Sequence, residues 1–137
     1  MRAMRAMAWG LVLSVAAATW AGEAAKEAEK APAPAGPIVH SVYFWLKDDA
    51  KPEDVETLIR DCKELGSLDC VQRIEVGRPL PTKRGAPVDS SYTVGIVVLF
   101  ADQTAYDAYG PHPKHQELVA KHKGLWKKVV VYDFVKQ

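Results

Sequence analysis

The side chains best suited to chemistry in this chain lie in one short segment, residues 109–115, which reads Tyr-Gly-Pro-His-Pro-Lys-His. It carries one phenol, Tyr109, and two imidazoles, His112 and His115. Glycine and proline at positions 110 and 111 end a helix, whereas Pro113 suits the first turn of a new helix, where its missing N–H would have no partner anyway. A residue before proline favours extended backbone, so His112 is expected to project from the junction. The segment therefore predicts a helix–helix junction that can hold a small molecule and accept a proton from it.

His115 is the best candidate for a proton acceptor. It lies in the first turn of the second predicted helix and shares a helical stripe with Leu118 and His122, so it is expected to face the sheet. The positive end of a helix disfavours imidazolium, so His115 should be neutral near pH 7 and able to take a proton. Tyr109, at the end of the preceding helix, is placed to hydrogen-bond a carbonyl group. His40 lies on the apolar face of a predicted strand and enters the same cavity if that face meets the helices.

Other interpretations of these side chains remain open. A half-buried histidine at a helix start often only caps or packs, Tyr109 can be a core residue, and His122 fits packing better than function. His112 and His115, three residues apart, also have the spacing of metal ligands, but no cysteine or carboxylate completes the three or four ligands that zinc sites use. The chain has no phosphate-binding glycine loop and no serine nucleophile elbow. These residues therefore support cofactor-free chemistry, or plain binding of a ligand.

The composition is that of a soluble globular protein, with 48% hydrophobic and 26% charged residues among 137. A formal net charge of +1 predicts no surface for nucleic acid. Residues 1–21 combine a basic start, a short apolar stretch and small residues near Ala21, the pattern of a secretory signal peptide. The stretch is shorter than the roughly 20 residues of a membrane span, although an uncleaved anchor is the alternative. We expect a periplasmic or secreted protein with no stable membrane span after cleavage.

The remaining sequence divides into a tether and one domain. Residues 22–37 consist almost entirely of Ala, Glu, Lys and Pro, which predicts a disordered tether before a domain over 38–137. Two cysteines, Cys62 and Cys70, lie inside the domain. An oxidising compartment would permit a disulfide between them. Alternatively, Cys62 lies on the apolar face of a predicted helix, where a free thiol packs as a small hydrophobe.

The domain is predicted to fold in the order strand, helix, strand, strand, helix, strand. Four segments rich in β-branched and aromatic residues read as strands: 38–47, 70–78, 91–100 and 127–135. Residues 79–89, with three prolines, read as a long exposed loop. Two split βαβ halves of this kind form an α+β domain with a four-stranded antiparallel sheet and both helices on one face.

The helices have clear start and stop signals. The first begins at Pro52, has apolar residues at spacings of three and four, and ends before Gly66. The second helical region has two pieces, one capped by Asp102 and ending near Tyr109, the other running from Pro113 to about residue 123. With all helices on one side, the other sheet face is bare and its alternate residues are also apolar. Covering that face predicts a homodimer, sheet against sheet.

Several of these segments resemble the stress-responsive dimeric α/β-barrel (Dabb) family. The resemblance covers Ile38 to Val135 and rests on four segments: 38–47, Phe100 followed by Ala108-Tyr109, His112-Pro113-Lys114-His115, and 131–134. It implies a ferredoxin-like βαββαβ fold that pairs into a dimeric α/β barrel. It also implies a link to stress responses, with no assigned activity in many members.

The resemblance further implies roles for individual residues. In the family's plant polyketide cyclase, which performs an intramolecular aldol condensation without cofactor, a histidine acts as base and a tyrosine supports it. By motif position these roles fall on His115 and Tyr109, with His40 and His112 lining the pocket. Val94 stands where the cyclase has a further pocket histidine, so the pocket here would be less polar.

Three functions follow as expectations. The first is an exported homodimer with a pocket for a small organic ligand, engaged in binding or stress response, either as a non-catalytic module or with cofactor-free acid–base chemistry. The alternative is a polyketide-cyclase-like lyase that uses His115 and Tyr109. The third is a haem- or oxygen-using relative of the same barrel superfamily, although no residue marks an axial ligand.

Overall fold

The computed structural model describes residues 35–137. The predicted signal peptide over 1–21 lies outside the described residues, and so does the predicted tether up to residue 34. The described part contains a four-stranded sheet in the order β2-β3-β1-β4, in which every neighbouring pair is antiparallel. Its strands are β1 (Ile38–Leu46), β2 (Arg73–Gly77), β3 (Val94–Phe100) and β4 (Trp126–Val135). The predicted α+β, ferredoxin-like βαββαβ fold is confirmed.

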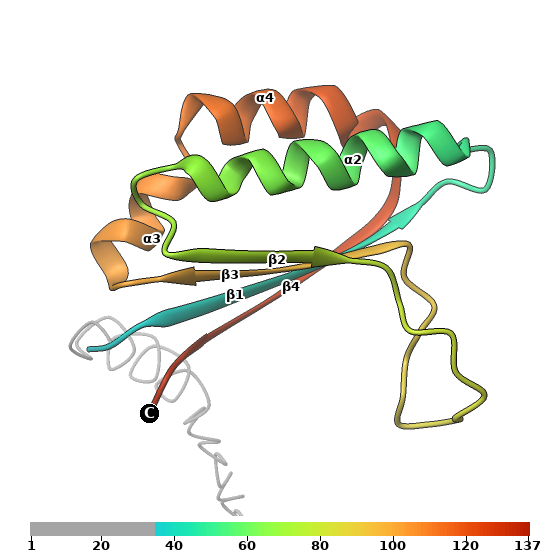
Figure 1. Cartoon of the computed structure of the whole chain (residues 1–137), viewed down its shortest axis with the longest axis horizontal. Coiled ribbons are helices and arrows are strands. Elements are labelled where there is room, and N and C mark those ends of the chain that lie inside the picture. Colours follow the sequence, from blue (N-terminus) through green and yellow to red (C-terminus); the bar gives the residue numbers. More distant parts are fainter. Residues whose placement is uncertain (1–34) are drawn as a thin grey trace, which may run out of the picture. The chain divides into compact units, whose positions relative to one another are not determined.

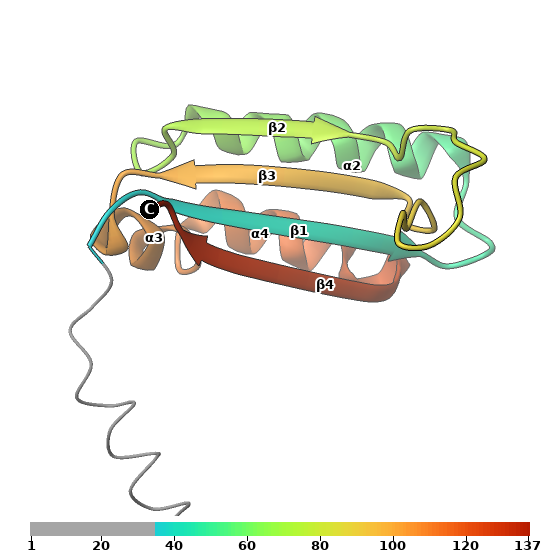
Figure 2. The ribbon, with the colours of Figure 1, turned by 90° about the horizontal axis from the view of Figure 1, so that it is seen from below.

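The helices of residues 35–137 all lie on one face of the sheet, as Figure 1 shows. They are α2 (Pro52–Glu64), η1 (Leu65–Ser67), α3 (Gln103–Tyr109), α4 (Pro113–His122) and η2 (Lys123–Leu125). Figure 2 looks at the opposite, open face of the sheet, with α2 and α4 behind it. No helix among residues 35–137 combines the length and the hydropathy needed to cross a membrane.

The helix boundaries follow the local signals in the sequence. Asp102 caps α3, because its carboxylate accepts a hydrogen bond from the backbone N–H of Ala105 at 2.9 Å. Pro113 occupies the first turn of α4, and His112 before it has the extended backbone expected of a residue preceding proline (φ −61°, ψ 133°). The junction between α3 and α4 therefore forms where glycine and proline predicted it.

Two strands begin later than the sequence suggested. β2 begins at Arg73 rather than at residue 70, because the backbone N–H of Val71 donates to the carbonyl of Leu68 and keeps this stretch in a turn. β3 begins at Val94 rather than at residue 91, because the backbone N–H of Ser91 donates to the Asp89 carboxylate. In both cases a local turn satisfies backbone groups that the sheet would otherwise use.

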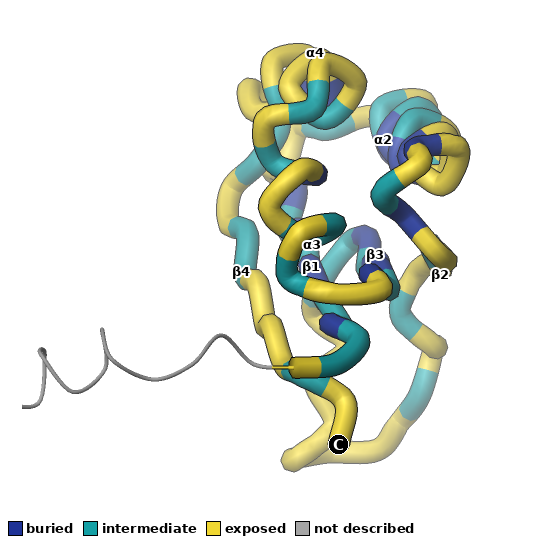
Figure 3. The backbone as a smooth tube through the Cα atoms, turned by 90° about the vertical axis from the view of Figure 1, so that its left-hand side faces the viewer, coloured by how far each residue is buried: buried dark blue, intermediate teal, exposed yellow. Residues whose placement is uncertain are grey.

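The core lies between the helices and the sheet, where Figure 3 shows the buried segments of the strands facing α2 and α4. Phe100, Leu58 and Cys62 are fully buried in it. Burial raises the pKa of the Cys62 thiol to about 12, and Cys62 and Cys70 are both free. Of the two alternatives for these cysteines, the structure therefore has the free thiols.

The open face of the sheet carries large apolar side chains. Strand pairing places Tyr43 opposite Val130 and Gly95, and places Ser41 opposite Tyr132 and Val97. Tyr132 is 61% exposed on this face, and Phe134 and Val97 are exposed as well. The bare apolar face expected from the sequence is therefore present.

Candidate functional site

Tyr109 and His115 meet at the junction between α3 and α4. Tyr109 is the last residue of α3 and is buried. His115 lies in the first turn of α4, and its ring centroid is 4.6 Å from that of Tyr109, at a tilt of 50°. Burial raises the pKa of the Tyr109 phenol, so this group keeps its proton at neutral pH. The two rings that the sequence placed at this junction are in contact.

The backbone fixes the tautomer of His115. Its Nδ1 lies 3.0 Å from the carbonyl oxygen of Gly110. A carbonyl oxygen only accepts, so Nδ1 carries the hydrogen and Nε2 of the neutral ring is left as an acceptor. The side-chain amide of Gln116 donates to the same carbonyl at 2.6 Å. Nε2 of His115 has no hydrogen-bond partner among residues 35–137. It is also not among the fully buried polar atoms of these residues that lack a partner, so it is open to a ligand or to solvent.

Burial also controls the charge of His115. It lowers the pKa of the imidazole, and nearby His40 and His112 lower it further, while the bond to the Gly110 carbonyl acts in the opposite direction. The sequence predicted a neutral His115 because of the helix terminus. The direction agrees, but desolvation is the main cause.

His40 joins this site from β1, and it brings two residues that the sequence analysis missed. Its ring centroid lies 5.8 Å from that of Tyr109 in an edge-on arrangement. Its Nδ1 lies 2.6 Å from the Asp133 carboxylate, which also accepts a hydrogen bond from the Tyr106 hydroxyl at 2.9 Å. The available signal for Asp133 was a single carboxylate between two aromatic residues of the strand, Tyr132 and Phe134.

His112 and Val94, also named from the sequence, occupy different places. His112 caps α4, with its Nδ1 accepting from the backbone N–H of Lys114 at 3.2 Å. Val94 is fully buried and pairs with Phe44, whereas the residue of β3 opposite His40 is Val98. Val94 and Val98 are four residues apart, which is roughly 13 Å along a strand. The structure thus brings Tyr109, His115 and His40 together and leaves Val94 in another part of the core.

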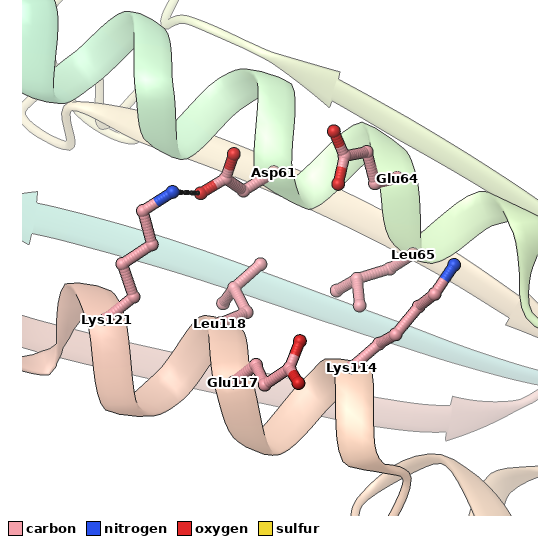
Figure 4. A pocket seen from close by; sticks show the side chains of 7 residues that line it. All are labelled: Asp61, Glu64, Leu65, Lys114, Glu117, Leu118 and Lys121. Atoms are coloured by element: carbon pink, nitrogen blue, oxygen red, sulfur yellow. Dashed lines mark hydrogen bonds and ion pairs between the residues drawn. The ribbon is translucent and has the colours of Figure 1, made fainter.

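Four hollows on the described part of the domain lie away from these rings. One of about 180 Å³ lies between α2 and α4, and Figure 4 shows its lining by seven side chains: Asp61, Glu64, Leu65, Lys114, Glu117, Leu118 and Lys121. The other three follow the loop between β2 and β3 and the adjoining open face of the sheet. None of the four is lined by Tyr109, His115 or His40.

A polar cluster joins α2 to α4 beside the first hollow. The Asp61 carboxylate accepts hydrogen bonds from Lys121 Nζ at 2.6 Å and from His122 Nε2 at 2.8 Å. Burial raises the pKa of Asp61, but hydrogen bonds from Lys121, His122 and Arg60 outweigh burial and hold the pKa at about 2. His122 is buried, in agreement with a packing role. Among residues 35–137, no three His, Cys, Asp or Glu side chains are grouped to hold a metal ion.

Comparisons with known proteins agree with this fold. The model of the stress responsive A/B barrel domain (Dabb) matches residues 38–136. A Dabb family protein with a ferredoxin-like fold from Mesorhizobium loti is 28% identical, with a TM-score of 0.62, and the match covers 75% of this chain and 99% of that one. No protein with a curated description matches the sequence.

Two further solved structures share the fold at lower identity. A dimeric ferredoxin-like protein of unknown function from Thermobifida fusca is 20% identical, with a TM-score of 0.62 over 77% of this chain and 95% of that one. A hydroxynitrile lyase from Passiflora edulis is 16% identical, with a TM-score of 0.67 over 76% of this chain and 96% of that one. At these identities the likeness concerns the fold alone.

Proposed function

Because the chain belongs to the stress responsive A/B barrel (Dabb) family, we propose that it binds a small organic molecule at the α3–α4 junction and abstracts a proton from it without a cofactor. One observation carries this proposal. His115 has its Nδ1–H engaged by the Gly110 carbonyl, which leaves Nε2 as a free acceptor beside the Tyr109 ring. A neutral imidazole in a fixed orientation is the usual form of a general base.

The neighbouring groups suit this chemistry. Burial lowers the pKa of His115, which keeps the base unprotonated near pH 7. Burial raises the pKa of Tyr109, which keeps its O–H available as a hydrogen-bond donor. When a proton leaves a carbon next to a carbonyl group, negative charge develops on the carbonyl oxygen, and a fixed donor stabilises it. His115 would take the proton, and Tyr109 would donate to the oxygen.

We propose a small substrate rather than an extended polyketide. Phe100 packs against Tyr109 with ring centroids 5.0 Å apart and against Tyr106 at 5.6 Å. Because Phe100 also packs against His40, with ring centroids 6.2 Å apart, we propose simple proton abstraction rather than the cyclase-like aldol condensation of a long chain.

Exchange of hydrogen for deuterium at the methyl group of acetophenone tests the proposal. In D2O, proton NMR should show exchange above the buffer rate, rising with pH through a pKa below that of an ordinary histidine. His115→Ala should reduce exchange to the buffer rate, and Tyr109→Phe should reduce it in part. Lys114→Ala, on the exposed side of the same helix, should leave it unchanged. Equal rates with wild type, with His115→Ala and with buffer alone would contradict the proposal.

We also propose that the protein forms a homodimer through the open face of its sheet. The exposed Tyr132, Phe134 and Val97 support this, because a bare apolar sheet face is costly in water. Sedimentation equilibrium should give twice the chain mass, and Val97→Asp should shift the equilibrium toward single chains. A single chain at all concentrations of the wild type would contradict the proposal.

The basic and apolar pattern of residues 1–21 further supports a proposal of export to the periplasm or the medium. Cell fractionation and N-terminal sequencing of the mature protein should place the first residue after position 21. Recovery of the full chain from the cytoplasm would contradict export.

A further inference from the structure

The connection between β2 and β3 is much longer than its topology requires. These strands are antiparallel neighbours, which a loop of two to five residues can join. Here the loop extends over residues 78–93. Figure 1 shows it on the side of the sheet away from the helices, so it extends past the open face. Long loops in compact domains are commonly functional.

This loop presents an apolar side chain to solvent. Leu80 is 76% exposed, the highest value among the exposed large hydrophobic side chains of residues 35–137. It stands between Pro79 and Pro81, whose rings fix the backbone on both sides. A leucine held outward in this way has little freedom to fold back onto its own domain.

An aromatic hollow of about 320 Å³ lies on the open face next to the loop. It is lined by five residues: Tyr43, Trp45, Asp89, Tyr92 and Tyr132. Tyr43 and Tyr92 pack edge-on with centroids 4.9 Å apart, and Trp45 donates a hydrogen bond to Ser91 at 2.9 Å. The walls of the hollow are therefore fixed by contacts between the sheet and the loop.

A glycine makes room for these rings. A Cβ at Gly95 would lie 3.2 Å from the Tyr92 ring and 3.3 Å from the Tyr43 ring. A side chain there would require the two rings to shift by a few tenths of an ångström. The close approach of these rings to β3 is therefore helped by a position without a side chain.

We propose that loop 78–93 is an arm that clasps a second copy of this chain, with Leu80 of one copy packed in the aromatic hollow of the other. The proposal rests on the proposed homodimer. A two-fold interface requires each copy to carry both the projecting and the receiving element, and this chain carries both. Tyr132 belongs to the hollow and to the exposed apolar face, so the two contact areas are continuous.

Photo-crosslinking in mixed dimers tests the contact directly. Leu80 is replaced by the photoreactive residue benzoylphenylalanine in 15N-labelled chains, which are mixed with unlabelled wild-type chains before irradiation. Mass spectrometry should find crosslinks between heavy and light chains that end in the peptides containing Trp45, Tyr92 or Tyr132. Crosslinks confined to a single chain would overturn the arm.

Dimer dissociation measured by sedimentation gives a second readout. Leu80→Asp should raise the dissociation constant at least tenfold, because it places a charge in an aromatic hollow. Lys83→Ala, an exposed position of the same loop, should leave the constant within a factor of two. An unchanged constant for Leu80→Asp in a chain that still dimerises would overturn the arm alone. A wild-type chain that never dimerises would overturn both the arm and the proposed homodimer.

Discussion

The imidazole of His40 and the carboxylate of Asp133 face each other across β1 and β4, with Nδ1 2.6 Å from Oδ1. The two residues are directly paired in the register of these strands. A carboxylate only accepts, so Asp133 holds the hydrogen of His40 on Nδ1. The other carboxylate oxygen accepts from the Tyr106 hydroxyl, so the carboxylate is held from two sides. The orientation of His40 is therefore set by a residue 93 positions away in the sequence.

Asp133→Asn should release this orientation. An amide can present its NH2 group instead of an oxygen, so His40 should no longer keep its hydrogen on Nδ1. Long-range proton–nitrogen NMR of the His40 ring should show a mixture of tautomers in the variant and one tautomer in the wild type. The free energy of unfolding should fall by about 1–2 kcal/mol. The control, Tyr106→Phe, removes one hydrogen bond to Asp133 but leaves the carboxylate, so it should preserve the tautomer of His40. An unchanged His40 spectrum in Asp133→Asn would show that Asp133 does not set this tautomer.

The lowered pKa of His115 should make stability depend on pH. The unfolded histidine takes up a proton near pH 6.5, whereas the folded one resists it, so stability falls as pH drops below that value. His115→Gln should therefore lose less stability than the wild type between pH 7 and pH 5, as measured by urea unfolding. The NMR titration midpoint of the His115 ring should lie below that of an ordinary histidine. A midpoint above 6.5 would contradict the burial argument.

Asp61 should also make stability fall as pH drops, but in a lower pH range than His115. Its folded pKa of about 2 lies below the ordinary value of 3.8, so its contribution is full above about pH 4 and is lost as pH falls toward 2. Asp61→Asn should lower the free energy of unfolding by about 2 kcal/mol at pH 7, and the difference should shrink between pH 4 and pH 2.

The matched control for Asp61 is Asp48→Asn. Asp48 also bonds a lysine, Lys127, but its side chain is 88% exposed, whereas that of Asp61 is 13% exposed. A surface ion pair of this kind contributes little, so Asp48→Asn should change stability by less than about 0.5 kcal/mol. If Asp61→Asn lowers the free energy of unfolding no more than Asp48→Asn does, the hydrogen bonds between Asp61 and α4 do not stabilise the fold.

The sequence predicted the features of this domain that depend on neighbouring residues. The α3–α4 junction follows from glycine and proline chemistry around Tyr109 and His115, which acts within a few residues. The element order follows from the spacing of apolar residues. The later starts of β2 and β3 escaped prediction, because the turns at Val71 and Ser91 compete with the sheet for the same backbone groups.

The parts of the site that depend on strand register could not be predicted. Asp133 reaches His40 only because β4 pairs with β1 in one particular register. The neighbours of Val94, which the resemblance places in the pocket, depend on strand register in the same way. Pairing of β1 with β3 places Val98 opposite His40 and puts Val94 beside Phe44. A strand pattern shows which face a residue occupies, but the partner strand determines its neighbours.

Gly66 should tolerate no larger residue, for reasons of packing alone. A Cβ there would lie 2.7 Å from Cγ2 of Ile74, a branched side chain with little freedom to move. Gly66→Ala should therefore lower the free energy of unfolding by about 1–3 kcal/mol in urea denaturation. Gly124→Ala, with nothing within 4 Å of its Cβ, should be neutral or slightly stabilising. Ile74→Ala should remove the clash. The loss of unfolding free energy in the double variant should therefore be smaller than the sum of the two single losses by about 0.5 kcal/mol or more. Strictly additive losses would contradict this contact.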